Sequence, residues 1–132
     1  MLVTKPILGK KDVVILDATK KGTEDRFTIV IEMKVKGTER TFKDVLFYDA
    51  ANTNRISVLP AIIYALAEQT NLPVEKFRTE TEDSYDLDID KVLKHIKGKE
   101  IKIERTSVVS ERNGQTYYNV NYRPEEETEV EL

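Results

Sequence analysis

The chain has 132 residues, 39% of them hydrophobic and none of them cysteine, which suits one domain with a single core and excludes disulfides and thiolate metal sites. No stretch approaches the roughly 20 apolar residues of a membrane span, and Met1–Lys10 has no apolar segment of signal-peptide length, so we expect a cytoplasmic protein. The formal net charge is −3, but five of the 24 acidic residues lie among the last eight positions, which leaves 19 acidic against 21 basic residues in the body of the chain.

The first part of the chain has the pattern of strands. Met1–Asp12 is polar and predicts a loose lead-in, and Val13–Ala18 is an apolar run of strand length. Lys20–Asp25 has a glycine at its centre and predicts a turn. Phe27–Val35 alternates between apolar and polar residues over most of its length, which is typical of a half-buried strand. Arg40–Tyr48 is apolar on both faces and predicts a third strand, joined to the second in a hairpin or meander.

The middle of the chain changes to helical spacing. Ser57–Thr70 places apolar residues on one face of a helix, with Ser57 as its N-cap. Phe77–Ser84 is acidic and polar and predicts a loop. Asp88–Lys97 predicts a second, shorter helix with Asp88 as its N-cap, and the glycine that follows ends it.

Strand signals return in the last third of the chain. Glu100–Val109 and Thr116–Arg123 predict two strands. Ser110–Gln115 between them contains Asn113-Gly114, a strong hairpin signal because both residues tolerate positive φ. Residues 1–124 are therefore predicted to form one domain, and residues 125–132 an acidic C-terminal tail that we expect to be disordered.

Three strands, a helical insert and two further strands are the layout of an OB-fold, which is a five-stranded Greek-key barrel. We therefore predict a mainly β protein with an OB-fold-like barrel and helices between the third and fourth strands. In such a fold the face of strands two and three and two flanking loops bind oligonucleotides or oligosaccharides. Those loops correspond here to Lys20–Asp25 and Ser110–Gln115.

The chain resembles phage-encoded single-stranded-DNA-binding proteins with a single OB-fold domain. The resemblance is carried by the segments FTIVIEMKV, RTFKDVLFY, SVLPAIIYALAEQT, IKGKEIKIERTSV, GQTYYNVNYRP and EEETEVEL. It covers roughly Val13 to Leu132 and is one of layout, without an invariant motif. It implies binding of single-stranded DNA with little sequence preference, in support of DNA replication or recombination in the host cell cytoplasm.

The acidic end of the chain has its own implied role. The resemblance implies that replication or recombination proteins contact this tail, here through Glu125, Glu126, Glu127, Glu129, Glu131 and Leu132. The tail departs from the bacterial type because it does not end in an aromatic residue.

The sequence itself supplies the residue types that a single strand needs. Phosphates are held by a cationic groove, and bases stack on aromatic faces. Both types are interleaved along the predicted strands. The candidate nucleic-acid-binding residues are Lys34, Lys36, Phe42, Lys43, Phe47, Tyr48, Lys102, Arg105, Arg112, Tyr117, Tyr118, Tyr122 and Arg123.

Structural roles compete with binding at these positions. Phe42 and Phe47 lie on opposite faces of one strand, so at least one of them belongs to the core. The adjacent Tyr117 and Tyr118 also face opposite ways, so we expect one of them in the core and the other free to stack on a base. Tyr122 shares the face of Tyr118. Lysines on edge strands commonly serve solubility or prevent edge pairing.

No feature of the sequence predicts catalysis. His95 is the single histidine, and G-x-S-x-G, P-loop and G-x-G-x-x-G motifs do not occur. The cluster Asp83, Asp86, Asp88 and Asp90 lacks the glycine and the closing glutamate of an EF-hand and is better explained by helix capping. We therefore expect no enzyme, no cofactor and no bound metal.

The competing class is a protein-interaction module, an inhibitor or adaptor built on a small barrel without nucleic-acid binding. A DNA mimic is disfavoured because the body of the chain is slightly basic, and a saccharide-binding barrel is a further alternative. Unpaired edge strands would also allow assembly into a homo-oligomer.

Overall fold

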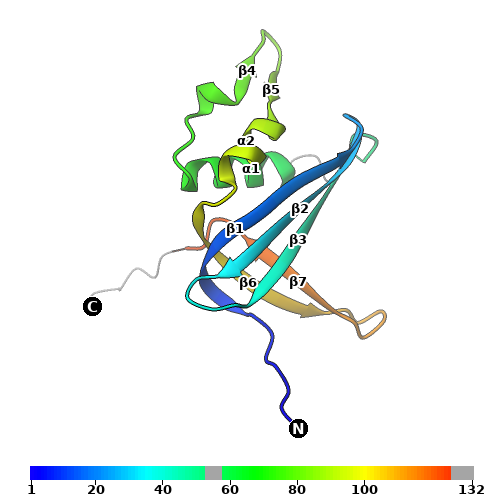
Figure 1. Cartoon of the computed structure of the whole chain (residues 1–132). Coiled ribbons are helices and arrows are strands. Elements are labelled where there is room, and N and C mark those ends of the chain that lie inside the picture. The colour runs from blue at the N-terminus through cyan, green and yellow to red at the C-terminus, as the bar shows by residue number, and fades with distance from the viewer. Residues whose placement is uncertain (53–57, 126–132) are drawn as a thin grey trace, which may run out of the picture.

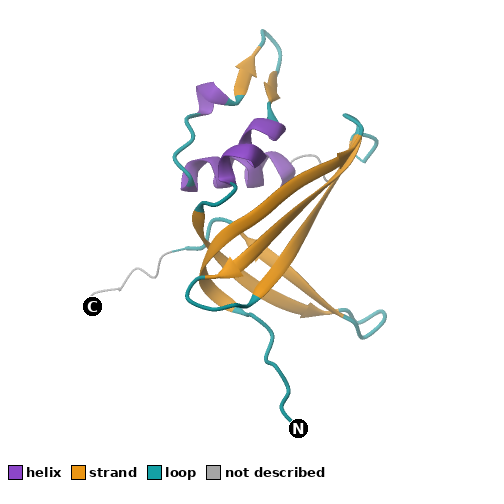
Figure 2. Cartoon of the chain, viewed as in Figure 1, coloured by secondary structure: helices purple, strands orange, loops and turns teal. Residues whose placement is uncertain are grey.

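The computed structural model describes residues 1–52 and 58–125, which form a mainly β fold with two helices (Figures 1 and 2). The long strands are β1 (Gly9–Gly22), β2 (Arg26–Val35), β3 (Thr41–Asp49), β6 (Glu100–Val109) and β7 (Thr116–Asn121). The insert between β3 and β6 consists of α1 (Val58–Gln69), the 3-10 turn η1 (Val74–Lys76), β4 (Arg78–Glu80), β5 (Tyr85–Leu87) and α2 (Ile89–Ile96).

The long strands form one antiparallel sheet in the order β3-β2-β1-β6-β7. The central strand β1 pairs with β2 along most of its length and with β6 over Gly9–Val14. A bulge between Ile15 and Asp17 interrupts its register with β2, and such bulges increase local twist. Figure 2 shows the sheet curling, with both helices at one end of it.

The two edge strands of the curled sheet are joined by side chains. In the part of the chain that the structure describes, β3 and β7 form no ladder with each other. Instead, the Tyr122 hydroxyl donates a hydrogen bond of 2.6 Å to Asp44 Oδ2 on β3. The Arg105 guanidinium lies 4.8 Å from the Phe42 ring centre and 4.1 Å from that of Tyr118. The sheet is thus not a hydrogen-bonded closed barrel, and we call this junction the seam.

Alternating residues of the strands build the core. Phe27, Ile29, Ile31 and Met33 of β2 are buried, and so are the facing residues of β1 and β6. The helices close the end of the core with a second set of buried side chains, among them Leu59, Ile63, Leu66, Val92, Leu93 and Ile96. Each fully buried aliphatic side chain contributes about 1.5–3 kcal/mol relative to exposure, so this apolar set holds the insert on the sheet.

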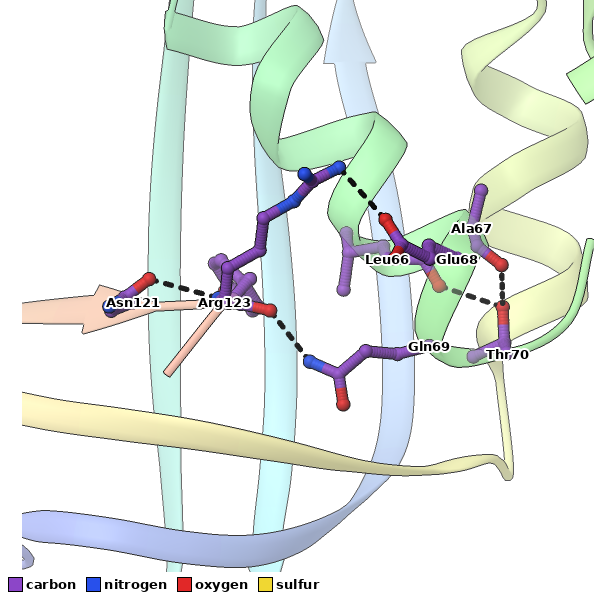
Figure 3. A network of polar contacts seen from close by, with 8 residues as sticks. Leu66, Ala67, Glu68, Gln69, Thr70, Asn121 and Arg123 are labelled. Carbon is purple, nitrogen blue, oxygen red and sulfur yellow. Dashed lines mark hydrogen bonds and ion pairs between the residues drawn. The ribbon is translucent and has the colours of Figure 1, made fainter. Parts of the chain in front are cut away.

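Gln69, in the last turn of α1, attaches the insert to the sheet (Figure 3). Its Nε2 donates to the carbonyl oxygens of Lys102, at 2.7 Å, and Tyr122, at 2.6 Å, and its Oε1 accepts from the Lys102 amide at 2.7 Å. Nearby, Arg123 forms an exposed ion pair of 3.1 Å with Glu68. A helix side chain therefore satisfies backbone groups of β6 and of the segment after β7, where the strand ladder has ended.

Several sequence predictions are confirmed. The alternation in β2 and the spacing in both helices match the buried faces. Asp88 caps α2, because its Oδ1 accepts a 3.1 Å hydrogen bond from the Lys91 amide. Gly98, with φ of +79°, follows the helix as expected. The predicted cap Ser57 lies outside the described residues.

Other predictions are wrong in instructive ways. The lead-in Met1–Asp12 is not wholly loose, because β1 begins at Gly9 and pairs there with β6. The supposed loop Phe77–Ser84 contributes β4 to a small hairpin with β5.

The predicted hairpin at Asn113-Gly114 is confirmed, because β6 and β7 pair on either side of this turn. Within the turn Gly114 adopts positive φ and Asn113 does not. Among the described residues, no helix is long and apolar enough to cross a membrane.

Candidate nucleic-acid interface

The outward face of β2 and β3 carries the first group of predicted residues. Cross-strand pairing places Thr28 beside Phe47, Val30 beside Val45 and Glu32 beside Lys43. These side chains point away from the core because their neighbours in sequence fill it. We call the surface formed by Thr28, Val30, Glu32, Lys34, Lys43, Val45 and Phe47 the strand face.

Phe47 is the most exposed aromatic residue of the strand face. Its side chain is 64% exposed, although it lies within a regular strand. Lys43 lies on the same side of β3, two residues before Val45, and has no ion pair within the described residues. By contrast, Lys34 Nζ lies 3.8 Å from Glu39 Oε1. The strand face therefore combines an uncovered ring with at least one cation that has no acidic partner at ion-pair distance.

The β6–β7 hairpin carries the second group of residues. Its outer part, Thr106–Asn119, is exposed almost throughout and lies at the end of the molecule opposite the helices (Figure 1). Tyr117 and Tyr118 are 49% and 40% exposed, so the expectation that one of them belongs to the core is wrong. Arg112 lies in the turn and is exposed. We call Thr106–Asn119 the hairpin arm.

Side-chain contacts orient the two tyrosines differently. The Tyr117 hydroxyl accepts from Asn113 Nδ2 at 3.1 Å and donates to Gln115 Oε1 at 3.2 Å, which ties this ring to the turn. Tyr118 stacks on the Arg105 guanidinium at the seam. Both rings thus have fixed orientations and exposed faces, an arrangement that suits stacking on bases.

Arg105 lies partly buried at the root of the hairpin arm. Its Nη1 donates a 3.0 Å hydrogen bond to the Ile7 carbonyl, while its buried Nε has no hydrogen-bond partner in the described structure. Burial lowers the pKa of Arg105 from its ordinary value, and nearby Tyr118 and Asp44 oppose this. Burial also raises the pKa of the Asp44 carboxyl, which the hydrogen bond from Tyr122 partly offsets. The Arg105 guanidinium is therefore held in place by the Ile7 carbonyl and by the rings of Phe42 and Tyr118 at the seam.

Three predicted aromatic residues are not available as stacking surfaces. Phe42 and Tyr122 are buried, at 8% and 3% exposure, because they point into the core from β3 and from the end of β7. Burial and the Asp44 carboxylate raise the pKa of the Tyr122 hydroxyl, which is thus a fixed donor. Tyr48 is half-buried and stacks on Phe27 with ring centres 4.8 Å apart. We leave these three residues out of the interface.

Two predicted cations are paired with acidic side chains. Lys36 lies 2.9 Å from Glu100, whose carboxylate raises the pKa of the lysine through a hydrogen bond. Arg123 pairs with Glu68 at the end of α1. These pairs are exposed and contribute little to stability, but they reduce the attraction of the two cations for phosphates.

Lys102 lies away from the strand face, in a basic hollow of about 620 Å³. The hollow is also lined by Lys10, Lys11, Asp12 and Glu125, and Lys10 Nζ donates to the Glu125 carbonyl. Sequence reasoning missed Lys10 and Lys11 because it began the first strand at Val13. Lys11, Val13 and Ile15 are spaced two residues apart and lie on one side of β1. This spacing could have indicated that the first strand begins before Val13.

The acidic tail is described only at its first residue. Glu125 is exposed and lies beside the basic hollow. The other predicted tail residues, Glu126, Glu127, Glu129, Glu131 and Leu132, lie outside the described residues.

His95 has a structural role. His95 Nε2 forms a 2.9 Å hydrogen bond with the Thr70 carbonyl, which links α2 to the end of α1. Across residues 1–52 and 58–125, no group of three or more His, Cys, Asp or Glu side chains is placed to hold a metal ion. No protein-family model matches the chain, and no curated protein matches it.

Proposed function

We propose that this protein binds single-stranded DNA, with little sequence preference, through the strand face and the hairpin arm. In this role it would cover single strands during replication or recombination, with no catalytic activity of its own. The proposal includes an OB-fold-like barrel in which the seam takes the place of a fifth strand–strand ladder.

The order of the elements supports the fold part of this proposal. Three strands, a helical insert and two strands form a single curled antiparallel sheet, and its first strand pairs with the second and with the fourth long strand. In OB-folds the binding surface lies on strands two and three and between two loops. The corresponding surface here is the strand face.

The exposure of Phe47 is the observation that carries the proposal. A phenylalanine that projects from a regular strand into water contributes little to the fold, and a base stacked on it would remove its apolar area from water. The neighbouring Lys43 and the more distant Arg112 supply charges for phosphates. Tyr117 and Tyr118 add two further exposed rings on the hairpin arm.

Fluorescence anisotropy with a labelled oligothymidine of about 30 nucleotides tests this function at two salt concentrations. We expect binding that weakens as salt rises and that resists competition by unlabelled duplex DNA. Phe47→Ala should weaken it about 5- to 150-fold, since one stacked base is worth roughly 1–3 kcal/mol.

Tyr85→Ala provides the control, because Tyr85 is another exposed aromatic residue, at 46% exposure, and lies on β5, outside the strand face and the hairpin arm. Its removal should leave the affinity for the oligomer unchanged. Absence of binding at low salt would overturn the proposal and favour the protein-interaction module. Equal losses in the two variants would show that the strand face is not the site.

A further inference from the structure

A second concave surface lies where the helical insert meets the end of the sheet. It is a cleft of about 800 Å³, between the β1–β2 turn on one side and β5 with the start of α2 on the other. Phe27, Leu59 and Ile63 are buried at its floor, and the half-buried Tyr48, Leu87 and Ile89 supply apolar surface that a ligand can contact. The cleft shares no lining residue with the basic hollow or the hairpin arm.

Among the described residues, the charged side chains around this cleft are nearly all acidic. Carboxylates from the β1–β2 turn and from the β5–α2 segment line it, and Lys20 is the one basic lining residue in that part of the chain. The acidic lining residues are Glu24, Asp25, Asp86, Asp88 and Asp90. Two separate segments therefore direct negative charge to one apolar floor, and we call this surface the acidic cleft.

Some of these charges are already used within the fold. Lys20 lies 3.5 Å from Asp90 and stands over the Phe27 ring at 4.9 Å. Asp88 caps α2. By contrast, Glu24, Asp25 and Asp86 form no ion pair within the part of the chain that the structure describes, so three carboxylates remain to act on a ligand.

The acidic cleft is not an extension of the DNA surface. A concentration of carboxylates repels phosphates, and the field is strongest in a cleft with low-dielectric walls. The same field attracts a cationic ligand. A volume of about 800 Å³ falls in the range of sites that enclose a ligand, roughly 300–1,000 Å³.

We infer that the acidic cleft binds a short segment of a partner protein in which apolar side chains alternate with lysine or arginine. The apolar side chains would contact Tyr48, Leu87 and Ile89, and the cations would face Glu24, Asp25 and Asp86. Tyr85, which also lines the cleft, already packs against one guanidinium, that of Arg78 at 4.1 Å. Its ring is thus a suitable neighbour for a cation.

The probe is a fluorescein-labelled, end-blocked peptide of sequence KLKFKLK, compared by anisotropy with ELEFELE, which has the same apolar residues. We expect the full-length protein to bind the basic peptide in a salt-sensitive way and not to bind the acidic one. The triple variant Glu24→Gln, Asp25→Asn, Asp86→Asn should weaken binding of the basic peptide by about tenfold.

A second triple variant controls for net charge. Glu39→Gln, Glu75→Gln and Glu111→Gln remove the same number of charges from positions outside the cleft and should leave peptide affinity unchanged. Equal losses in the two triple variants would overturn the inference, because they would indicate general attraction to an acidic protein. No binding of the basic peptide at low salt would also overturn it.

The acidic tail is a separate source of negative charge and needs its own variant. The triple variant Glu127→Gln, Glu129→Gln, Glu131→Gln should change the affinity for the peptide by no more than about twofold. That is well below the tenfold loss, about 1.4 kcal/mol, expected for the cleft variant. Binding that is lost in this variant and kept in the cleft variant would assign the peptide to the tail and overturn the inference.

The inference does not depend on DNA binding. Phe47→Ala should leave peptide binding intact, and the cleft variant should still bind oligothymidine. Failure of peptide binding alone would therefore leave the proposed function standing, and failure of DNA binding alone would leave the acidic cleft standing.

Discussion

The strand face and the acidic cleft both expose aromatic rings to water, yet the charges around these rings are opposite. Phe47 shares its surface with Lys43 and Lys34, whereas Tyr85 lines a cleft with several carboxylates. A ring alone therefore does not identify a ligand, because every base and many side chains can stack on it. The charges beside the ring decide whether a phosphate chain or a cationic peptide can approach.

The largest expected effect tests the aromatic part of this comparison. Phe47→Ala combined with Tyr118→Ala should weaken oligothymidine binding by about 2–6 kcal/mol, since two stacking surfaces are lost. Peptide binding in the acidic cleft should be unchanged in the same variant. Anisotropy with both probes measures this, and a parallel loss of both activities would mean that the fold, not the surface, was damaged.

The next effect concerns the attachment of the helical insert to the sheet. Gln69→Ala removes three hydrogen bonds between α1 and backbone groups near the seam, so it should lower the free energy of unfolding by about 1–3 kcal/mol. Urea unfolding measures this loss. The neighbouring Glu68→Ala breaks only an exposed ion pair and should cost less than about 1 kcal/mol. Equal costs would show that Gln69 does not hold the insert on the sheet.

A smaller, pH-dependent effect is expected at the seam. Burial raises the pKa of Asp44, so the folded state holds this proton more tightly than the unfolded chain does, and the associated stability is lost as pH rises through the folded-state pKa. Asp44→Asn removes this titration and still accepts from Tyr122. The Tm of the variant relative to the unmodified protein should therefore rise as pH increases from about pH 4 to about pH 7. A constant difference would contradict the assignment.

The smallest effect separates phosphate contacts from stacking. Arg112→Ala should reduce the slope of log affinity against log salt by about 0.7, the value for one phosphate contact to a single strand. Asp86→Asn, in the acidic cleft, should leave the slope unchanged. A reduced slope in the second variant would show that DNA reaches the cleft.

The sequence predicted those parts of the fold in which one face of an element is buried. The alternation of Phe27, Ile29, Ile31 and Met33 specified β2 because one sheet face meets the core. The extension of β1 to Gly9 was missed, since polar residues there are held by pairing on β6. The three-residue strands of the β4–β5 hairpin are too short to show a period.

The candidate interface was predictable in residue type and only partly in placement. Phe42 and Phe47 were known to face opposite ways, but only the register with β2 decides which one is exposed. The burial of Tyr122 depends on Asp44, a residue 78 positions earlier in the chain. The acidic cleft was not foreseen, because its carboxylates come from two segments that only the tertiary fold brings together.

The Gln69 contact gives the protein an internal reporter of motion. The Lys102 amide hydrogen is bonded to a helix side chain, so its exchange with deuterium is governed by undocking of the insert and not by fraying of the strands. Protection at Lys102 compared with the amides of β2 would reveal whether the helices detach as a unit before the sheet unfolds. Because Lys102 also lines the basic hollow, a ligand in that hollow would register in the same signal.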